Sequence, residues 1–202
     1  MQRLRSDGKY GSGDCKFTNQ NLMVYTKIQN KIQKLKLSVV AVVVQSDQSS
    51  TEDKTLSQRH RDYLVQLTDI FHDIMGQIWC YRVNKTQYLS QFKEFLSQEL
   101  ELMEYILDYE VLPYCESHPE FLTSFSPLSH KFEMATAQAR ELESLLGETY
   151  SESNKSLIEG INPFLNRLST FLFWMGRLYG DDNYVYWTKF SDKLYQPTDL
   201  TS

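Results

Sequence analysis

Hydrophobic residues recur along most of this chain at intervals of three and four, which is the spacing of one face of an α-helix. The first such pattern covers residues 22–44, although the valines at its end would also suit a strand. Residues 45–57 are a polar linker, and a second apolar stripe follows at residues 58–81. The N-terminal part of the chain is therefore predicted to form two long amphipathic helices.

The next patterns predict two more helices separated by a loop. Apolar residues at helical spacing cover residues 92–111, and Pro113 stops this helix. Residues 113–127 contain three prolines and are predicted to be a loop. A fourth helix is predicted at residues 128–146, with Gly147 as its C-cap.

The last apolar stripe, from Ile158 to Tyr179, contains Pro163. A proline inside a helix removes a hydrogen bond and costs about 3 kcal/mol. We therefore predict that Asn162 is an N-cap and that the fifth helix covers residues 163–179.

Five amphipathic helices predict an all-α fold, a five-helix antiparallel bundle at residues 22–180. The chain of 202 residues fits one domain, and its 8 Gly and 5 Pro are too few for a fold with many tight turns. Residues 1–21 are predicted to be a flexible, Gly-bearing basic arm, and residues 181–202 a C-terminal tail.

The formal net charge of −5 is unevenly distributed. Residues 1–36 contain eight Lys or Arg and two Asp, whereas residues 90–160 contain four Lys or Arg and fourteen Asp or Glu. The acidic bulk argues against a nucleic-acid partner, while the short basic segment suits a small molecule that carries phosphate. A nucleotide is therefore favoured over a polynucleotide.

Cysteine content and hydropathy bear on the compartment. The three cysteines share no CxxC spacing and cannot all pair, which is typical of a reducing compartment. No stretch reaches the roughly 18 apolar residues that a membrane span needs. The expected location is the cytoplasm, with the mitochondrial matrix as the alternative.

The common catalytic and phosphate-binding motifs are absent from the sequence. Cys115, His118 and His130 have only a faint likeness to metal ligands, and a proline between them breaks any helix that would present them together. We therefore predict no metal site. His60 and His72 are predicted to be surface or interface residues.

Two segments have residue combinations that suit anion binding. The arm combines cations such as Arg3 with glycines, so its backbone could approach a phosphate closely; a flexible tail is the alternative. On the fourth helix, Arg140 and Glu143 share one face at i and i+3, where a structural ion pair is the alternative. Asn166 and Arg167 interrupt the apolar stripe of the fifth helix.

These residues resemble a known family. Residues 162–180 (NPFLNRLSTFLFWMGRLYG) are similar to the last-helix signature of the corrinoid (cob(I)alamin) adenosyltransferases of the PduO type. That signature is Asn-Arg-Leu-Ser, here beginning at Asn166, followed by an aromatic and apolar stretch. The Gly-bearing arm, the loop residue Phe121 and the Arg-x-x-Glu pair of Arg140 and Glu143 follow the order of the family.

The resemblance implies a five-helix bundle that assembles as a trimer with active sites between subunits. It implies that the adenosyl group of ATP, used with Mg²⁺, is transferred to cobalamin with loss of triphosphate. The implied catalytic residues are Arg140, on phosphate, and Phe121, at the corrinoid. The residues implied in nucleotide binding are Arg3, Asp7, Gly8, Glu143, Asn166 and Arg167.

A second observation favours assembly. Phe171, Phe173 and Trp174 on the fifth helix are predicted to lie outside its core stripe. The chain then has more apolar surface than one bundle can bury, which predicts an oligomer, a trimer if the copies are identical.

The chain also departs from the pattern of the family. Thr136 stands where the family has an Arg one turn before Arg140, and the Pro-Gly-Gly after the loop phenylalanine is absent. Gln29, Asn30 and Lys31 replace an acidic cluster of the first helix, which in the family pairs with an Arg of the fourth helix. Two functions therefore stay open. One is a divergent adenosyltransferase, and the other is a non-catalytic structural or assembly subunit of a larger complex that keeps the same bundle.

Overall fold

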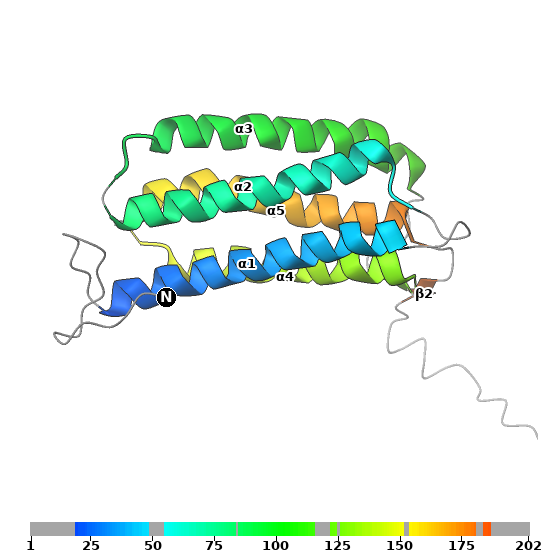
Figure 1. Ribbon diagram of the computed structural model, residues 1–202, viewed down its shortest axis with the longest axis horizontal. Helices are drawn as coiled ribbons and strands as arrows, with labels where there is room; N and C mark the ends of the chain where they lie inside the picture. The colour runs from blue at the N-terminus through cyan, green and yellow to red at the C-terminus, as the bar shows by residue number, and fades with distance from the viewer. Residues whose placement is uncertain are drawn as a thin grey trace, which may run out of the picture.

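Five long α-helices lie side by side in one elongated bundle (Figure 1). The computed structural model describes residues 19–48, 55–83, 85–115, 122–124, 126–151, 154–180 and 184–186. The helices are α1 (Asn19–Gln48), α2 (Gln58–Arg82), α3 (Leu89–Ile106), α4 (Pro127–Thr149) and α5 (Lys155–Leu178). The predicted all-α, five-helix bundle is confirmed. Within the described ranges, none of these helices combines the length and the apolar character that a membrane crossing requires.

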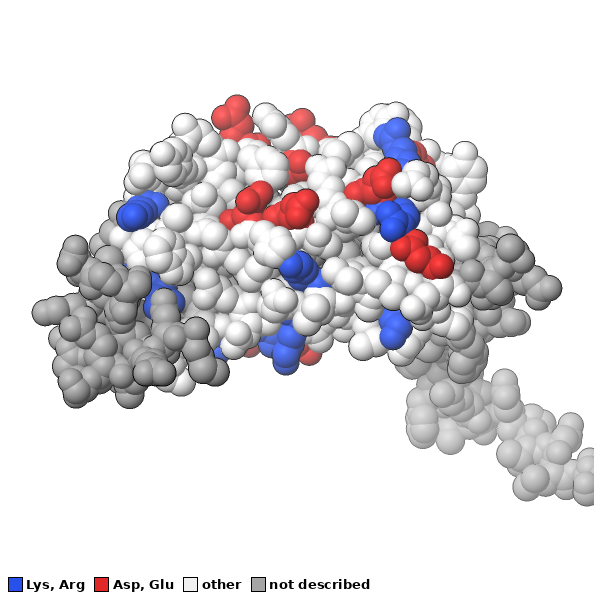
Figure 2. All heavy atoms as spheres, viewed as in Figure 1, with Lys and Arg blue, Asp and Glu red and all other residues white. Residues whose placement is uncertain are grey.

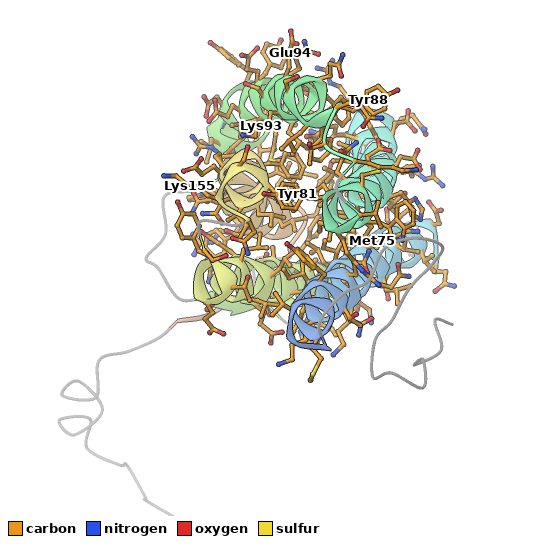
Figure 3. The ribbon with its side chains drawn as sticks, turned by 90° about the vertical axis from the view of Figure 1, so that its left-hand side faces the viewer. Met75, Tyr81, Tyr88, Lys93, Glu94 and Lys155 are labelled. Atoms are coloured by element: carbon orange, nitrogen blue, oxygen red, sulfur yellow. The ribbon has the colours of Figure 1, made fainter. Side chains whose placement is uncertain are left out.

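Helices α1 and α5 each pack against two neighbouring helices. Helix α1 packs against α2 and α4, and α5 packs against α4 and α3. Neighbours along the chain run in opposite directions, but α3 and α5 run the same way (Figure 1). Lys93 of α3 bonds to Ser156 near the start of α5, and Glu104 bonds to Arg167 further along both helices. Seen along the bundle axis, α3 and α1 lie on opposite sides (Figure 3).

Serine side chains set the start of two helices. Ser57 precedes α2 in an extended conformation, and its hydroxyl accepts a hydrogen bond from the His60 N–H at 3.2 Å. Ser126 does the same for α4, where Pro127 occupies the first helical position. Both caps satisfy a backbone donor that the first turn of a helix leaves without a partner.

The predicted start of the fifth helix is wrong. Helix α5 begins at Lys155, and Pro163 lies inside it. The added turns bury Leu157, Ile158 and Ile161 on the same stripe as the rest of the helix. Burying three such side chains at about 1.5–3 kcal/mol each outweighs the cost of one proline, about 3 kcal/mol. The proline is itself exposed, so its ring displaces no core side chain.

The predicted C-cap of α4 is also wrong, because Gly147 lies inside the helix. Helix α4 continues to Thr149, whose carbonyl accepts a hydrogen bond from the Asn154 side chain at 2.8 Å. The amide oxygen of Asn154 in turn accepts from the Ser151 N–H at 2.8 Å. The turn between α4 and α5 is therefore closed by a buried asparagine rather than by a glycine.

The segment after α3 contains more structure than predicted. The helical path continues as a π-helical turn, η1 (Leu107–Val111), and a 3-10 turn, η2 (Leu112–Tyr114). Strand β1 (Leu122–Ser124) lies in the predicted loop and pairs antiparallel with β2 (Tyr184–Tyr186) in the predicted tail. A pairing between segments so distant in the sequence leaves no local pattern to detect.

Helix α5 supplies the centre of the core. Six of its fully buried side chains are Phe164, Leu165, Leu168, Phe171, Leu172 and Met175. The prediction for Phe171 is therefore wrong: it is 0% exposed and meets the ring of Tyr63 edge-on, with 5.5 Å between centroids. Phe173 and Trp174 are half-buried, and the Arg177 guanidinium lies 4.6 and 5.1 Å from their ring centroids.

Gly176 of α5 lies in tight contact with α4. A Cβ atom added there would lie 2.9 Å from the Cβ of Phe132, which is fully buried and has no room to move. We predict that Gly176→Ala lowers the free energy of unfolding by about 1–3 kcal/mol, because overpacking outweighs the better helix propensity of alanine.

The matched control for this prediction is Gly76→Ala in α2, where an added Cβ meets nothing within 4 Å. There we expect stabilisation by up to about 1 kcal/mol, since only the propensity term acts. Urea unfolding of both variants measures the difference. Equal stabilisation by the two substitutions would contradict the close contact.

Candidate functional site

Half of the residues implied in binding and catalysis lie on α4 and α5. Arg140 and Glu143 come from α4, and Asn166 and Arg167 from α5. The other four, Arg3, Asp7, Gly8 and Phe121, lie outside the described residues. The geometry of the candidate site is therefore that of the α4–α5 seam.

Glu143 and Asn166 meet across this seam. The Asn166 side-chain amide donates a hydrogen bond to Glu143 Oε1 at 2.8 Å. Arg140 lies one turn before Glu143 on α4, is exposed, and makes no ion pair with any described residue. The alternative of an i, i+3 ion pair between Arg140 and Glu143 is thus not what the structure contains. Glu143 uses a partner on the neighbouring helix instead.

Arg167 lies on a different side of α5. Its Nε and Nη2 atoms both donate to Glu104 Oε1 of α3, at 2.9 and 2.7 Å. Consecutive residues of an α-helix point about 100° apart, so Asn166 reaches α4 while Arg167 reaches α3. The structure brings Glu143 and Asn166 together and does not bring Arg167 to them.

The substituted positions near the seam are occupied by structural contacts. Thr136, one turn before Arg140, is buried, and its hydroxyl donates to the carbonyl of Phe132 at 2.8 Å. Lys31 of α1 forms an ion pair with Glu141 of α4, which lowers the pKa of that carboxyl through a side-chain hydrogen bond. Here the acidic partner lies on α4 and the basic one on α1. This is the reverse of the arrangement that the resemblance implies.

Among the described residues, no group of three or more His, Cys, Asp or Glu side chains is placed to hold a metal ion. Cys115 is half-buried, with its Sγ 3.7 Å from the carbonyl oxygen of Trp174, and His130 lies 3.6 Å from Glu133 of the same helix. His118 lies outside the described residues.

The prediction that His60 is a surface or interface residue is wrong, because its side chain is buried within one bundle. His60 is 5% exposed, and its Nδ1 lies 2.6 Å from the hydroxyl of Tyr179 at the end of α5. The same hydroxyl accepts a hydrogen bond from the Ser57 N–H at 3.0 Å. On the other side, His60 Nε2 lies 3.5 Å from Glu110 Oε2 of η1. His60 therefore ties the start of α2 to the ends of α3 and α5.

Burial lowers the pKa of His60, and the nearby Glu110 carboxylate opposes this shift only in part. Arg59, which is paired with Glu110 at 2.7 Å, adds to the lowering. The sequence did contain a signal for this burial, because His60 stands three residues before Tyr63 on the apolar stripe of α2. His72, by contrast, is exposed as predicted.

Comparisons with known proteins give one match. A model of the family described as cobalamin adenosyltransferase matches residues 24–179. This range covers all of the bundle except the first residues of α1, and it includes both sides of the α4–α5 seam. Neither the curated proteins nor the solved structures include a match to the chain.

The buried His60 predicts a loss of stability in mild acid. Because its folded pKa lies below the unfolded value of about 6.5, the unfolded chain binds more protons once the pH falls below that value. The stabilisation present above pH 6.5 is then lost progressively as the pH falls through the folded pKa.

Urea unfolding from pH 7.5 to 5 measures this loss in wild type, in His60→Gln and in the control His72→Gln. We expect the pH dependence between these values to flatten in His60→Gln and to persist in His72→Gln. An unchanged slope in His60→Gln would show that other groups are responsible.

Proposed function

Because the chain belongs to the cobalamin adenosyltransferase family, we propose that it transfers the adenosyl group of ATP to cob(I)alamin. In this transfer, a bond forms between the reduced cobalt and C5′ of ATP. The C5′–O bond breaks, and triphosphate leaves with the electron pair. The protein has to hold a triphosphate of high negative charge and to stabilise it as it leaves.

The observation that carries the proposal is the arrangement of Arg140, Glu143 and Asn166. A guanidinium offers up to five N–H donors to phosphate oxygens, and Arg140 is exposed without a carboxylate partner among the described residues. The bond from Asn166 fixes one oxygen of Glu143 and leaves Oε2 for a ribose hydroxyl or another nucleotide donor. In this proposal Arg140 binds phosphate and the pair positions the nucleoside.

The remaining assignments follow from the resemblance. We propose that Arg3, Asp7 and Gly8 of the arm bind the nucleotide and that Phe121 contacts the corrinoid. Mg²⁺ is ordinarily held by phosphate oxygens with one or two carboxylates. The proposed assembly is a homotrimer, and the proposed location is the cytoplasm or the mitochondrial matrix.

A specific observation favours the second candidate function, a non-catalytic structural or assembly subunit. Thr136 is buried and bonded to the helix backbone, so it supplies no cation where the family has an Arg. Arg167 is held by Glu104 and would have to leave this ion pair to reach a nucleotide at the seam. Nucleotide affinity separates the two functions, because only the transferase requires it.

We predict that Arg140→Ala weakens ATP binding by about 1.5–3 kcal/mol, or roughly 10- to 150-fold in Kd, through loss of a charge-assisted hydrogen bond. The melting temperature should hardly change, because Arg140 has no partner among the described residues. Isothermal titration with ATP and thermal melting of the same samples measure both quantities.

Two further variants sharpen this test. Lys155→Ala removes an exposed cation at the start of α5 and should leave ATP affinity unchanged. Arg167→Ala should lower stability by less than about 1 kcal/mol, as a partly exposed ion pair does, with little effect on Kd. Wild-type protein that binds no ATP at millimolar concentration would refute the transferase and leave the structural subunit.

The arm can be tested by truncation. We predict that deletion of residues 1–14 abolishes nucleotide binding, because it removes Arg3, Asp7 and Gly8 together. Helix content should stay the same, since α1 begins at Asn19. Circular dichroism and ATP titration of the truncated chain check both statements, and an unchanged ATP affinity would show that the arm is not part of the site.

A further inference from the structure

The α4–α5 seam carries a second polar contact beyond the pair of Glu143 and Asn166. The Tyr150 hydroxyl donates a hydrogen bond to Glu159 Oε1 at 3.3 Å. Tyr150 stands seven residues after Glu143, just past the end of α4. Glu159 stands seven residues before Asn166 on α5, and the two helices run in opposite directions (Figure 1). Both contacts therefore belong to one register and lie about 10 Å apart, at 1.5 Å per residue.

Gly147 and Asn162 lie between these two contacts. Gly147 follows Glu143 by four residues, and Asn162 precedes Asn166 by four, so each shares the face of its helix that lines the seam. A Cβ atom added at Gly147 would meet nothing within 4 Å among the described residues. The seam is therefore open at this level, with a glycine on the α4 side and an amide on the α5 side. It lies toward the end of the bundle that faces the viewer in Figure 3.

The turn of α5 at this open level has two acceptors without a helix donor. The Oδ1 atom of Asn162 is buried and accepts no hydrogen bond from the described residues, which is unfavourable for a polar atom. Asn162 as a whole is half-buried, so its amide can turn about its last bond and present Oδ1 at the seam. Pro163 has no N–H, so the carbonyl of Glu159 lacks its usual α-helical partner.

The levels of the seam follow the order of the parts of a nucleotide. Arg140 lies one turn before Glu143 on α4, and Gly147 lies one turn after it. In the proposed function, on which this step rests, Arg140 binds phosphate and the pair of Glu143 and Asn166 positions the nucleoside. The ribose of a nucleotide joins the phosphates to the base. The base is therefore expected on the side away from Arg140, at the open level of Gly147 and Asn162.

We propose that Asn162 recognises the adenine base of ATP at this level and so determines the base specificity of the site. Adenine carries an amino group at position 6, whose two hydrogens suit Asn162 Oδ1 and the Glu159 carbonyl. The Nδ2 of the same amide can donate to the neighbouring ring nitrogen, in the bidentate pairing that asparagine makes with adenine. Guanine and hypoxanthine carry an oxygen at position 6, which would face acceptors instead of donors.

Gly147 provides the space for the base. At Gly176, further along the seam, the side chain of Phe132 fills the place of a Cβ atom, whereas the place beside Gly147 is empty of described residues. A planar base can lie against the α4 backbone there, and a larger side chain would occupy the same space. The glycine and the asparagine thus have separate roles, one in access and one in recognition.

The groove between α2 and α3 is the competing place for a base. It has a volume of about 390 Å³ and is lined by residues that include Asp73, Tyr88 and Phe95. None of its described lining residues is a lysine or an arginine. Figure 2 shows acidic side chains gathered over the part of the surface where α2 and α3 lie. This surface repels a triphosphate, so the seam is the better place for the whole nucleotide.

The test compares ATP with inosine triphosphate and with inorganic tripolyphosphate, each titrated calorimetrically with Mg²⁺ into the full chain. Inosine triphosphate has an oxygen in place of the amino group, and tripolyphosphate has no base. We expect wild type to bind ATP at least about tenfold more tightly than inosine triphosphate. Asn162→Leu should lower the ATP affinity to that of inosine triphosphate, because both bases then lack a partner. The affinity for tripolyphosphate should stay unchanged.

Gly147→Val tests the space separately. The added side chain should weaken the binding of both nucleotides at least about tenfold and leave tripolyphosphate binding unchanged. The matched controls are Asn30→Leu on the exposed face of α1 and Gly76→Val on α2, where the added side chain also enters open space. Neither control should change any of the three affinities.

Thermal melting separates recognition from a structural role. Asn162→Leu removes a buried polar atom that has no partner among the described residues, so the melting temperature should not fall. A lower melting temperature with an unchanged preference for ATP would assign the residue to the packing of the bundle and overturn the proposal.

Three other results would overturn it. They are equal affinity of wild type for ATP and inosine triphosphate, an Asn162→Leu chain that keeps the preference for ATP, and a Gly147→Val chain that binds ATP as tightly as wild type does. Each of them leaves the transferase standing, because ATP still binds. A wild type that binds no ATP would overturn both proposals, so the failure of the adenine site is distinguishable from the failure of the proposed function.

Discussion

The structure depends on the burial of α5 between α3 and α4. Its apolar residues are covered by both neighbours along nearly the whole helix, and Gly176 lets α4 approach until Phe132 leaves no space for a Cβ atom. The polar residues at the edges of this buried stripe are consequently placed against one neighbour or the other. Asn166 meets Glu143 of α4, and Arg167 meets Glu104 of α3. The candidate site lies where it does because α5 has to be buried on two sides.

The existence and approximate extent of all five helices could be predicted from hydrophobic spacing, because each helix buries one stripe of apolar residues and their spacing is visible in the sequence. The helix ends could not. Helix α4 ends where the side chain of Asn154 reaches the carbonyl of Thr149, and α5 passes through Pro163 because three earlier residues gain burial. Both outcomes depend on competition between the local preference for ending a helix and contacts with distant residues. A local sequence pattern carries no information about those contacts.

The candidate site was predictable to a similar degree. Arg140 and Glu143 were placed on one face of a helix by their spacing alone, which needs only the helical period. The choice of Asn166 as the partner of Glu143, and of Glu104 as the partner of Arg167, depends on which helices are neighbours. His60 was misjudged because its polarity was weighted above its position, although inside the core a hydroxyl bonds to one of its ring nitrogens and a carboxylate lies 3.5 Å from the other.

The charges around Arg140 show why an exposed cation persists beside acidic residues. Its sequence neighbours on α4 include Glu141 and Glu143, and Glu143, at i+3, could neutralise it within the helix. Each is engaged elsewhere, Glu141 by Lys31 of α1 and Glu143 by Asn166 of α5. The guanidinium is therefore left without a carboxylate partner among the described residues, which is the state that an anion-binding arginine requires.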